Sequence, residues 1–192
     1  MNTAPSVSKQ LINCNSVLKF QNKATKNEKL SILLVGQSEF CHLISECIYS
    51  VSLQNEKIEL TISKSESIEN VLKSTSSLHI DFIIFLINTA QRHYIEQVER
   101  NISLVESLYL CDRMILVNGS NHLNPADMGL SYDELFNLSQ KYRLHIFNGN
   151  VKNEENCLAL TKRMLNFIIT TCGLKTGLPM ILEFPSNKFP VY

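Results

Sequence analysis

The segment after Gly36 has the spacing of a phosphate-binding loop but lacks the residues that bind phosphate. Such a loop reads G-x-x-x-x-G-K-[ST]: backbone N–H groups cradle the phosphates, the lysine neutralises them and the hydroxyl holds magnesium. Here Cys41, His42 and Leu43 replace the second glycine, the lysine and the hydroxyl residue. Glu39 adds negative charge where a phosphate would lie. Without the cation and the metal ligand, nucleotide binding is disfavoured.

A second degenerate motif runs from Asn118 to Asn121. It has the spacing of the N-K-x-D motif that reads guanine, with glycine in place of the lysine and asparagine in place of the base-binding aspartate. Gly and Asn are also typical turn residues, so we favour an ordinary turn here.

Other reactive side chains do not form a catalytic set. Cys41 and His42 are adjacent, and neighbouring helical residues point about 100° apart, so they are poorly placed as a nucleophile and its base. Asn88 follows an expected strand, where a magnesium-binding or phosphoacceptor aspartate could stand. Asp81 lies at the other end of that strand, which favours a structural role. We expect no catalytic residue, cofactor or metal.

The composition argues against several classes of function. Lys plus Arg and Asp plus Glu number 18 each, so no overall charge attracts the chain to nucleic acid or to an anionic membrane. The six cysteines never approach C-x-x-C spacing, which argues against a zinc site or a disulfide framework. No signal peptide is recognisable, and the longest aliphatic run is far shorter than the roughly 18 residues that span a bilayer. We expect a soluble, intracellular protein.

Apolar patterning predicts five strands that alternate with helices. Three runs are nearly continuous in aliphatic residues, as in strands buried on both faces of a parallel sheet, and two are shorter or alternate with polar residues. The runs are 30–36, 57–62, 80–88, 114–118 and 144–147. Between them, apolar residues recur at three- and four-residue steps, which predicts amphipathic helices. Ser131 with Glu134 predicts a capping box at the start of one helix.

This alternation predicts an α/β fold, a three-layer sandwich with a mainly parallel central sheet. The architecture resembles a Ras-like small GTPase that lacks the nucleotide-binding motifs. We divide the chain into a flexible N-terminal extension (1–28), a pseudo-GTPase domain (29–173) and a C-terminal tail (174–192) that packs on the domain or on a partner.

The order and spacing of these segments are similar to those of the centromere protein M family. The resemblance rests on 32–36, 80–88 and 114–119, joined by a helix, and continues more weakly to Ile181. It covers roughly residues 29–184. No single segment is diagnostic; the specificity lies in their order, their spacing and their shared lack of phosphate-binding residues.

The resemblance implies a protein that acts through its surface. It implies a non-enzymatic structural subunit of the inner kinetochore, in the constitutive centromere-associated network of the nucleus, that supports kinetochore assembly and chromosome segregation. The implied partners are centromere protein I and, with it, centromere proteins H and K. The alternative is a divergent Ras-like GTPase in trafficking or signalling that still binds nucleotide through altered contacts.

Two apolar segments outside the regular pattern predict a partner surface. Leu110 and Cys111 lie in a connection before a strand, where polar residues are expected. Leu178 and Ile181 lie in the tail, which is too short to build its own core. We predict that these four residues contribute to one hydrophobic patch, where the resemblance implies that centromere protein I docks. The alternative is a tail that folds back over the sheet.

Overall fold

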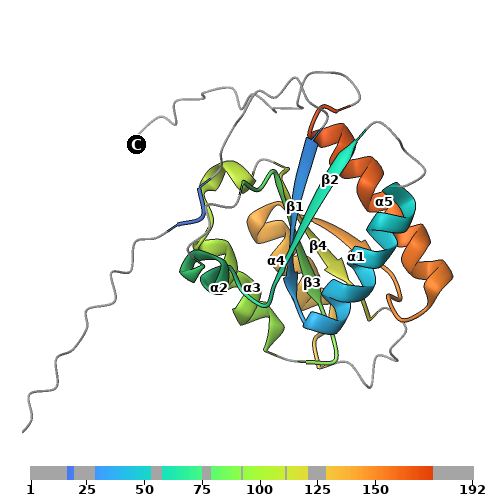
Figure 1. Ribbon diagram of the computed structural model, residues 1–192. Helices are drawn as coiled ribbons and strands as arrows, with labels where there is room; N and C mark the ends of the chain where they lie inside the picture. Colours follow the sequence, from blue (N-terminus) through green and yellow to red (C-terminus); the bar gives the residue numbers. More distant parts are fainter. Residues whose placement is uncertain are drawn as a thin grey trace, which may run out of the picture.

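The computed structural model describes residues 17–19, 29–52, 58–74, 79–91, 93–110, 112–120 and 129–174. In these ranges, five parallel strands form a sheet between two layers of helices (Figure 1). The strand order is β2-β1-β3-β4-β5. The strands are β1 (Lys29–Gly36), β2 (Glu59–Ser65), β3 (Phe82–Ile87), β4 (Met114–Asn118) and β5 (His145–Asn148).

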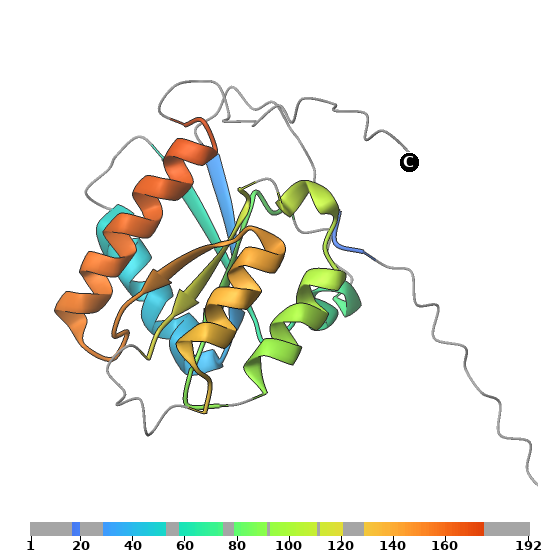
Figure 2. The same cartoon turned by 180° about the vertical axis from the view of Figure 1, so that it is seen from behind.

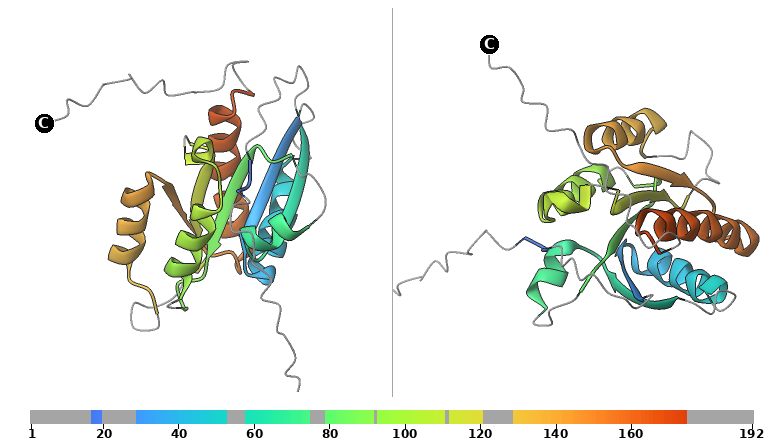
Figure 3. Two further views of the ribbon diagram at one scale, coloured as in Figure 1. Left: turned by 90° about the vertical axis from the view of Figure 1, so that its left-hand side faces the viewer. Right: turned by 90° about the horizontal axis from the view of Figure 1, so that it is seen from above.

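Helices cover both faces of the sheet. Helices α1 and α5 lie side by side on one face, and α2, α3 and α4 lie on the other (Figures 2 and 3). Within the described part of the chain, no helix is both long enough and apolar enough to cross a membrane. The helices are α1 (Ser38–Ser52), α2 (Ile68–Lys73), α3 (Tyr94–Ser103), the 3-10 helix η1 (Ser107–Leu110), α4 (Tyr132–Tyr142) and α5 (Glu154–Thr171).

The predicted three-layer α/β sandwich is confirmed, and its parallel sheet flanked by helices is consistent with a Ras-like fold. Parallel neighbours need a crossover connection, and a helix lies in each one. Strand β1 has β2 on one side and β3 on the other. The order in which strands are added to the sheet therefore reverses at β1, between β1 and β3. In open α/β sheets, ligands bind beyond the carboxyl ends of the strands at this point.

The core follows from the aliphatic runs in the central strands. All residues of β3 and β4 are buried. Successive side chains of a strand point to opposite faces, so each run supplies two apolar clusters. In β3, one set faces α1 and α5, and the alternate set faces α2, α3 and α4; the first is Phe82, Ile84 and Leu86, and the second is Ile83, Phe85 and Ile87.

The predicted capping box of α4 is confirmed. Ser131 Oγ accepts a hydrogen bond from the Glu134 N–H at 3.2 Å, and Glu134 Oε2 accepts one from the Ser131 N–H at 2.9 Å. Leu130 and Leu135, on either side of this cap, are buried in the same cluster. The start of α4 is therefore fixed by side chains that are close together in the sequence.

Strand β2 begins and ends later than the predicted range of 57–62. It runs from Glu59 to Ser65 because it pairs with β1 in parallel register over this whole length, up to Val35 opposite Ser65. The apolar alternation ends before the hydrogen-bonded pairing does. Pairing partners, which the local sequence does not reveal, thus set the end of this strand.

A short piece of the N-terminal segment contacts the domain. Leu18 is buried against the cluster on the α2, α3 and α4 face and forms a parallel bridge with Val105. Its N–H donates to the Leu104 carbonyl at 2.8 Å, and its carbonyl accepts from the Glu106 N–H at 3.0 Å. This contact lies within the predicted extension of 1–28, where the apolar residues have no regular period.

Candidate functional site

The carboxyl ends of four neighbouring strands bring together three residues that the sequence singled out, Gly36, Asn88 and Asn118, and a fourth that it did not, Asn148. Gly36 ends β1, and Asn88 directly follows β3. Asn118 and Asn148 end β4 and β5. Because these strands are parallel, all four residues lie at one edge of the sheet, where this fold class binds ligands. This carboxyl edge is the candidate site.

Gly36 is required by the packing of the sheet. Its φ is 156°, and a Cβ atom at this position would lie 2.5 Å from the carbonyl oxygen of Leu86 in β3. Any side chain would therefore push the two paired strands apart. The glycine that matches the start of a phosphate loop thus has a structural role that involves no phosphate.

Two residues in the first turn of α1, Phe40 and Glu39, contact other parts of the protein. Phe40 is buried, and its ring would lie 2.8 Å from a Cβ atom placed on Gly119. Glu39 is exposed and pairs with Lys152, with 3.2 Å between Oε1 and Nζ. The first turn of α1 therefore carries a carboxylate and a buried aromatic ring, and no cation, where a phosphate loop would bind an anion.

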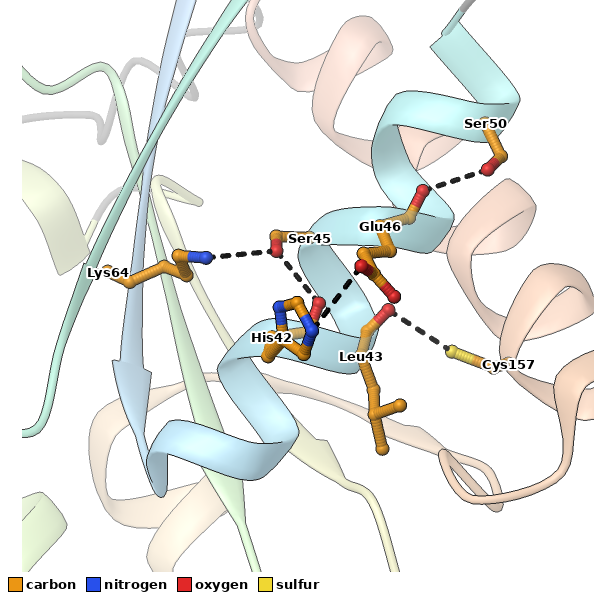
Figure 4. A network of polar contacts seen from close by, with 7 residues as sticks. All are labelled: His42, Leu43, Ser45, Glu46, Ser50, Lys64 and Cys157. Atoms are coloured by element: carbon orange, nitrogen blue, oxygen red, sulfur yellow. Dashed lines mark hydrogen bonds and ion pairs between the residues drawn. The ribbon is translucent and has the colours of Figure 1, made fainter.

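The next three residues of α1 have separate environments. Burial raises the pKa of the Cys41 thiol to about 11, although the positive charge of Lys64 opposes this shift. His42 is exposed, and its ring turns toward Glu46, with 3.3 Å between Nε2 and Oε1 (Figure 4). Leu43 packs against the cluster beneath α1 and α5. A protonated, buried thiol and an outward imidazole cannot act together as nucleophile and base.

Hydrogen bonds between neutral side chains connect β1, β3 and β4 at the carboxyl edge. Asn88 Nδ2 donates to Gln37 Oε1 at 3.1 Å, just beyond the end of β1. Ser120 Oγ donates to Asn88 Oδ1 at 3.1 Å and accepts from the Thr89 N–H at 2.9 Å. The Ser120 hydroxyl therefore acts as both donor and acceptor between the ends of β3 and β4.

Asn118 extends this set of bonds to β5. Its Oδ1 accepts from the Ser120 N–H at 3.1 Å, and its Nδ2 donates to Asn148 Oδ1 at 3.2 Å. Asn118 is 0% exposed. We refer to the whole set as the carboxyl-edge network; its members are Gln37, Asn88, Thr89, Asn118, Ser120 and Asn148.

The carboxyl-edge network is poorly suited to hold a nucleotide. Its side chains are amides and hydroxyls, whereas protein magnesium sites use carboxylates together with substrate phosphates. Both ends of the Asn118 amide are bonded inside the protein, so this side chain is not available to a base edge. The network connects the ends of the strands through hydrogen bonds between neutral groups.

A pocket of about 250 Å³ lies beside this edge, between the start of α1 and the end of β2. Typical ligand pockets are larger, about 300–1,000 Å³. Lys64 Nζ lies 3.5 Å from Ser45 Oγ, which donates to the His42 carbonyl (Figure 4). Glu66 lines the same pocket and opposes the charge of Lys64. The pocket therefore has no excess positive charge to select a phosphate.

Asp81 lies at the opposite edge of the sheet, where it has a structural role. Its Oδ2 accepts from the Ser31 N–H at 2.8 Å, and its Oδ1 lies 2.9 Å from His79 Nε2. Within the described residues, no three His, Cys, Asp or Glu side chains gather as a metal site requires. Asn121, the second residue of the degenerate base motif, lies outside the described residues.

Comparison with protein families shows which family this chain belongs to. Residues 15–184 match the family described as Centromere protein M (CENP-M). The chain belongs to the centromere protein M family. Members of this family are structural kinetochore components, so this is a centromere and kinetochore protein, located on chromosomes in the nucleus. A comparison with curated protein sequences finds no match.

The structure of this centromere protein M family member describes one of the four residues in the predicted partner patch. Leu110 ends η1 and packs, partly buried, against the cluster on the α2, α3 and α4 face. Cys111, Leu178 and Ile181 lie outside the described residues. Leu108, two positions before Leu110, is 51% exposed, which the apolar pattern did not single out.

Sequence reasoning also missed the residues that hold the carboxyl edge together. Gln37, Ser120 and Asn148 are of common surface types, and no motif marks them. The one available signal is their position, because each lies at or within two residues of an expected strand end. Their mutual contacts depend on strand order, which the sequence pattern leaves open.

Proposed function

We propose that this chain is a non-enzymatic structural subunit of the inner kinetochore, within the constitutive centromere-associated network. It binds centromere protein I and, with it, centromere proteins H and K, and so supports kinetochore assembly and chromosome segregation. The observation that carries this proposal is the family match over residues 15–184. A protein of this kind acts by placing its partners relative to one another.

The carboxyl edge supports the non-enzymatic part of the proposal. The ring of Phe40 and the ion pair of Glu39 with Lys152 occupy the start of α1. The Cys41 thiol is held in its neutral form by burial. Catalysis of phosphoryl transfer depends on cations that neutralise the phosphates and on a positioned nucleophile. Neither requirement is met by the described residues of this edge.

The proposed docking surface is the apolar patch that includes Leu110, Cys111, Leu178 and Ile181. Leu110 is partly buried at the end of η1, and Leu108 in the same turn exposes half of its surface. Large exposed apolar side chains commonly mark interaction sites. The patch is expected to contain a few residues that supply most of the binding energy.

Co-purification of the full chain with centromere proteins I, H and K tests the proposal. We expect the double variant Cys111→Glu with Ile181→Glu to lose centromere protein I while its Tm stays within a few degrees of wild type. Phe136→Glu is the matched control, because Phe136 is 58% exposed on α4; it should bind normally. Binding that survives the double change, or unfolding of the variant, would refute the patch. Failure of the wild-type chain to bind would refute the proposed partners.

A further inference from the structure

Two cysteines from distant parts of the chain meet between α1 and α5. Cys47 lies on α1 and Cys157 on α5, and their Sγ atoms are 2.9 Å apart. The helices that carry them lie side by side on the same face of the sheet (Figures 1 and 3). The Cys157 sulfur also points toward the Leu43 carbonyl of α1, at 4.0 Å (Figure 4).

This sulfur contact distinguishes the pair from the other described cysteines. Cys41 is buried and forms no sulfur–sulfur hydrogen bond with another described residue. The Cys172 sulfur accepts a hydrogen bond from Arg113 Nη1 at 2.8 Å. A disulfide bond is about 2.05 Å long, so the sulfurs of Cys47 and Cys157 need to approach by less than about 1 Å to form one.

We propose that Cys47 and Cys157 form a redox modification site, in which a small disulfide such as glutathione disulfide converts the two thiols into a bond between α1 and α5. First, the Cys47 thiolate attacks glutathione disulfide, which gives a Cys47–glutathione mixed disulfide and releases one glutathione. Cys157 then attacks the Cys47 sulfur and releases the second glutathione. The protein loses two hydrogen atoms, and the oxidant gains them as two thiols.

The environments of the two cysteines set the order of these steps. Cys47 is partly exposed and can meet a soluble oxidant, whereas Cys157 is buried. Burial, together with the smaller effect of the neighbouring Cys47, raises the pKa of Cys157 to about 12. The contribution from an ionised Cys47 disappears once this residue is in a mixed disulfide. The second step is also intramolecular, between groups already in contact, which favours it over attack by another thiol.

The disulfide would join residues 110 positions apart. A cross-link over such a long loop restricts the unfolded chain and so stabilises the folded one. Its two ends lie in helices that already pack on one cluster, so the folded domain needs little rearrangement. Oxidation would therefore lock the α1 and α5 layer without involving the carboxyl-edge network.

Mass spectrometry of the full-length protein tests the site. After full reduction and then incubation with glutathione disulfide, we expect the wild-type protein to lose the mass of two hydrogen atoms. Peptide mapping should show the Cys47–Cys157 link, and a thiol reductant should reverse it. Cys47→Ser and Cys157→Ser should prevent the link, and the matched control Cys172→Ser should form it. No mass loss, a persistent glutathione adduct on Cys47 or a link to another cysteine would each overturn the proposal.

Thermal unfolding gives a second measurement that does not depend on peptide recovery. Oxidised wild-type protein should melt roughly 5 to 15 °C above reduced protein. The Cys47→Ser variant should melt at the same temperature with and without glutathione disulfide. An unchanged Tm for cross-linked wild-type protein would show that the bond strains the packing of α1 on α5, which contradicts the proposed fit.

Discussion

Ser120 is central to the carboxyl-edge network, because its hydroxyl forms two hydrogen bonds, one as acceptor and one as donor. It accepts from the buried Thr89 N–H and donates to Asn88 Oδ1. Its own N–H is held by Asn118. A buried polar group that loses its partner costs more than the bond itself contributes, so such a network is strong only when it is complete.

The variant Ser120→Ala should therefore destabilise the protein although it removes a single oxygen atom. The Thr89 N–H, 2.9 Å from that oxygen, would be left unpaired in a buried position. We expect a loss of about 1–3 kcal/mol in unfolding free energy, or roughly 3 to 10 °C in Tm. Ser50→Ala is the matched control, because the Ser50 hydroxyl bonds to the Glu46 carbonyl on the exposed side of α1 (Figure 4). Equal Tm values for the two variants would contradict the role of Ser120.

The buried thiol of Cys41 predicts a loss of stability in alkali. Burial raises its pKa from the ordinary value of about 9 to about 11 in the folded protein. The protonated thiol contributes fully to the free energy of unfolding below pH 9, and this contribution is lost as the pH rises toward 11. The reason is that the thiol of the unfolded chain loses its proton at a lower pH than the thiol of the folded protein. We expect Tm to fall between about pH 9 and pH 11, and to fall less steeply in Cys41→Ala. Identical slopes in calorimetry would argue against this assignment.

The elements differ in how far local sequence determines them. Strands β1, β3 and β4 are predictable because continuous aliphatic runs fit strands buried on both faces. The start of α4 is predictable because Ser131 and Glu134 satisfy each other locally. The end of β2 is not, since its pairing with β1 continues to Ser65. The contact of Leu18 with Val105 likewise depends on a distant segment.

Leu34→Asp tests whether β1 is the centre of the fold. Leu34 is 0% exposed, lies between β2 and β3, and faces the cluster beneath α1 and α5. An unpaired carboxylate there costs several kcal/mol, a large part of the stability of a domain of this size. We expect circular dichroism to show an unfolded protein. Thr61→Asp, at an exposed position of the edge strand β2, should stay folded. A soluble Leu34→Asp variant with a cooperative melt would contradict this placement of β1.

The protein as a whole has the architecture of a ligand-binding α/β fold, and hydrogen bonds between neutral side chains connect the strand ends at its carboxyl edge. The missing lysine and hydroxyl residue after Gly36 were readable from the sequence, because a motif defines them. The carboxyl-edge network was not, because its members are ordinary residues that meet only when four strands align. The partner patch also remains a prediction, since three of its four residues lie outside the described ranges.

A charge-balanced surface fits a protein that assembles with other proteins. The chain has 18 basic and 18 acidic residues, so no overall field directs it to nucleic acid. The family match implies a centromeric location, and we propose that protein partners bring the chain there.

We expect the carboxyl edge of this protein not to bind a nucleotide. Titration of the full-length protein into a fluorescent guanine nucleotide with magnesium measures this binding. The carboxyl edge, with Phe40 and Glu39 at the start of α1, predicts no saturable binding tighter than about 10 μM. Saturable binding below about 10 μM, equivalent to roughly 7 kcal/mol, would contradict this expectation and favour a divergent nucleotide-binding GTPase.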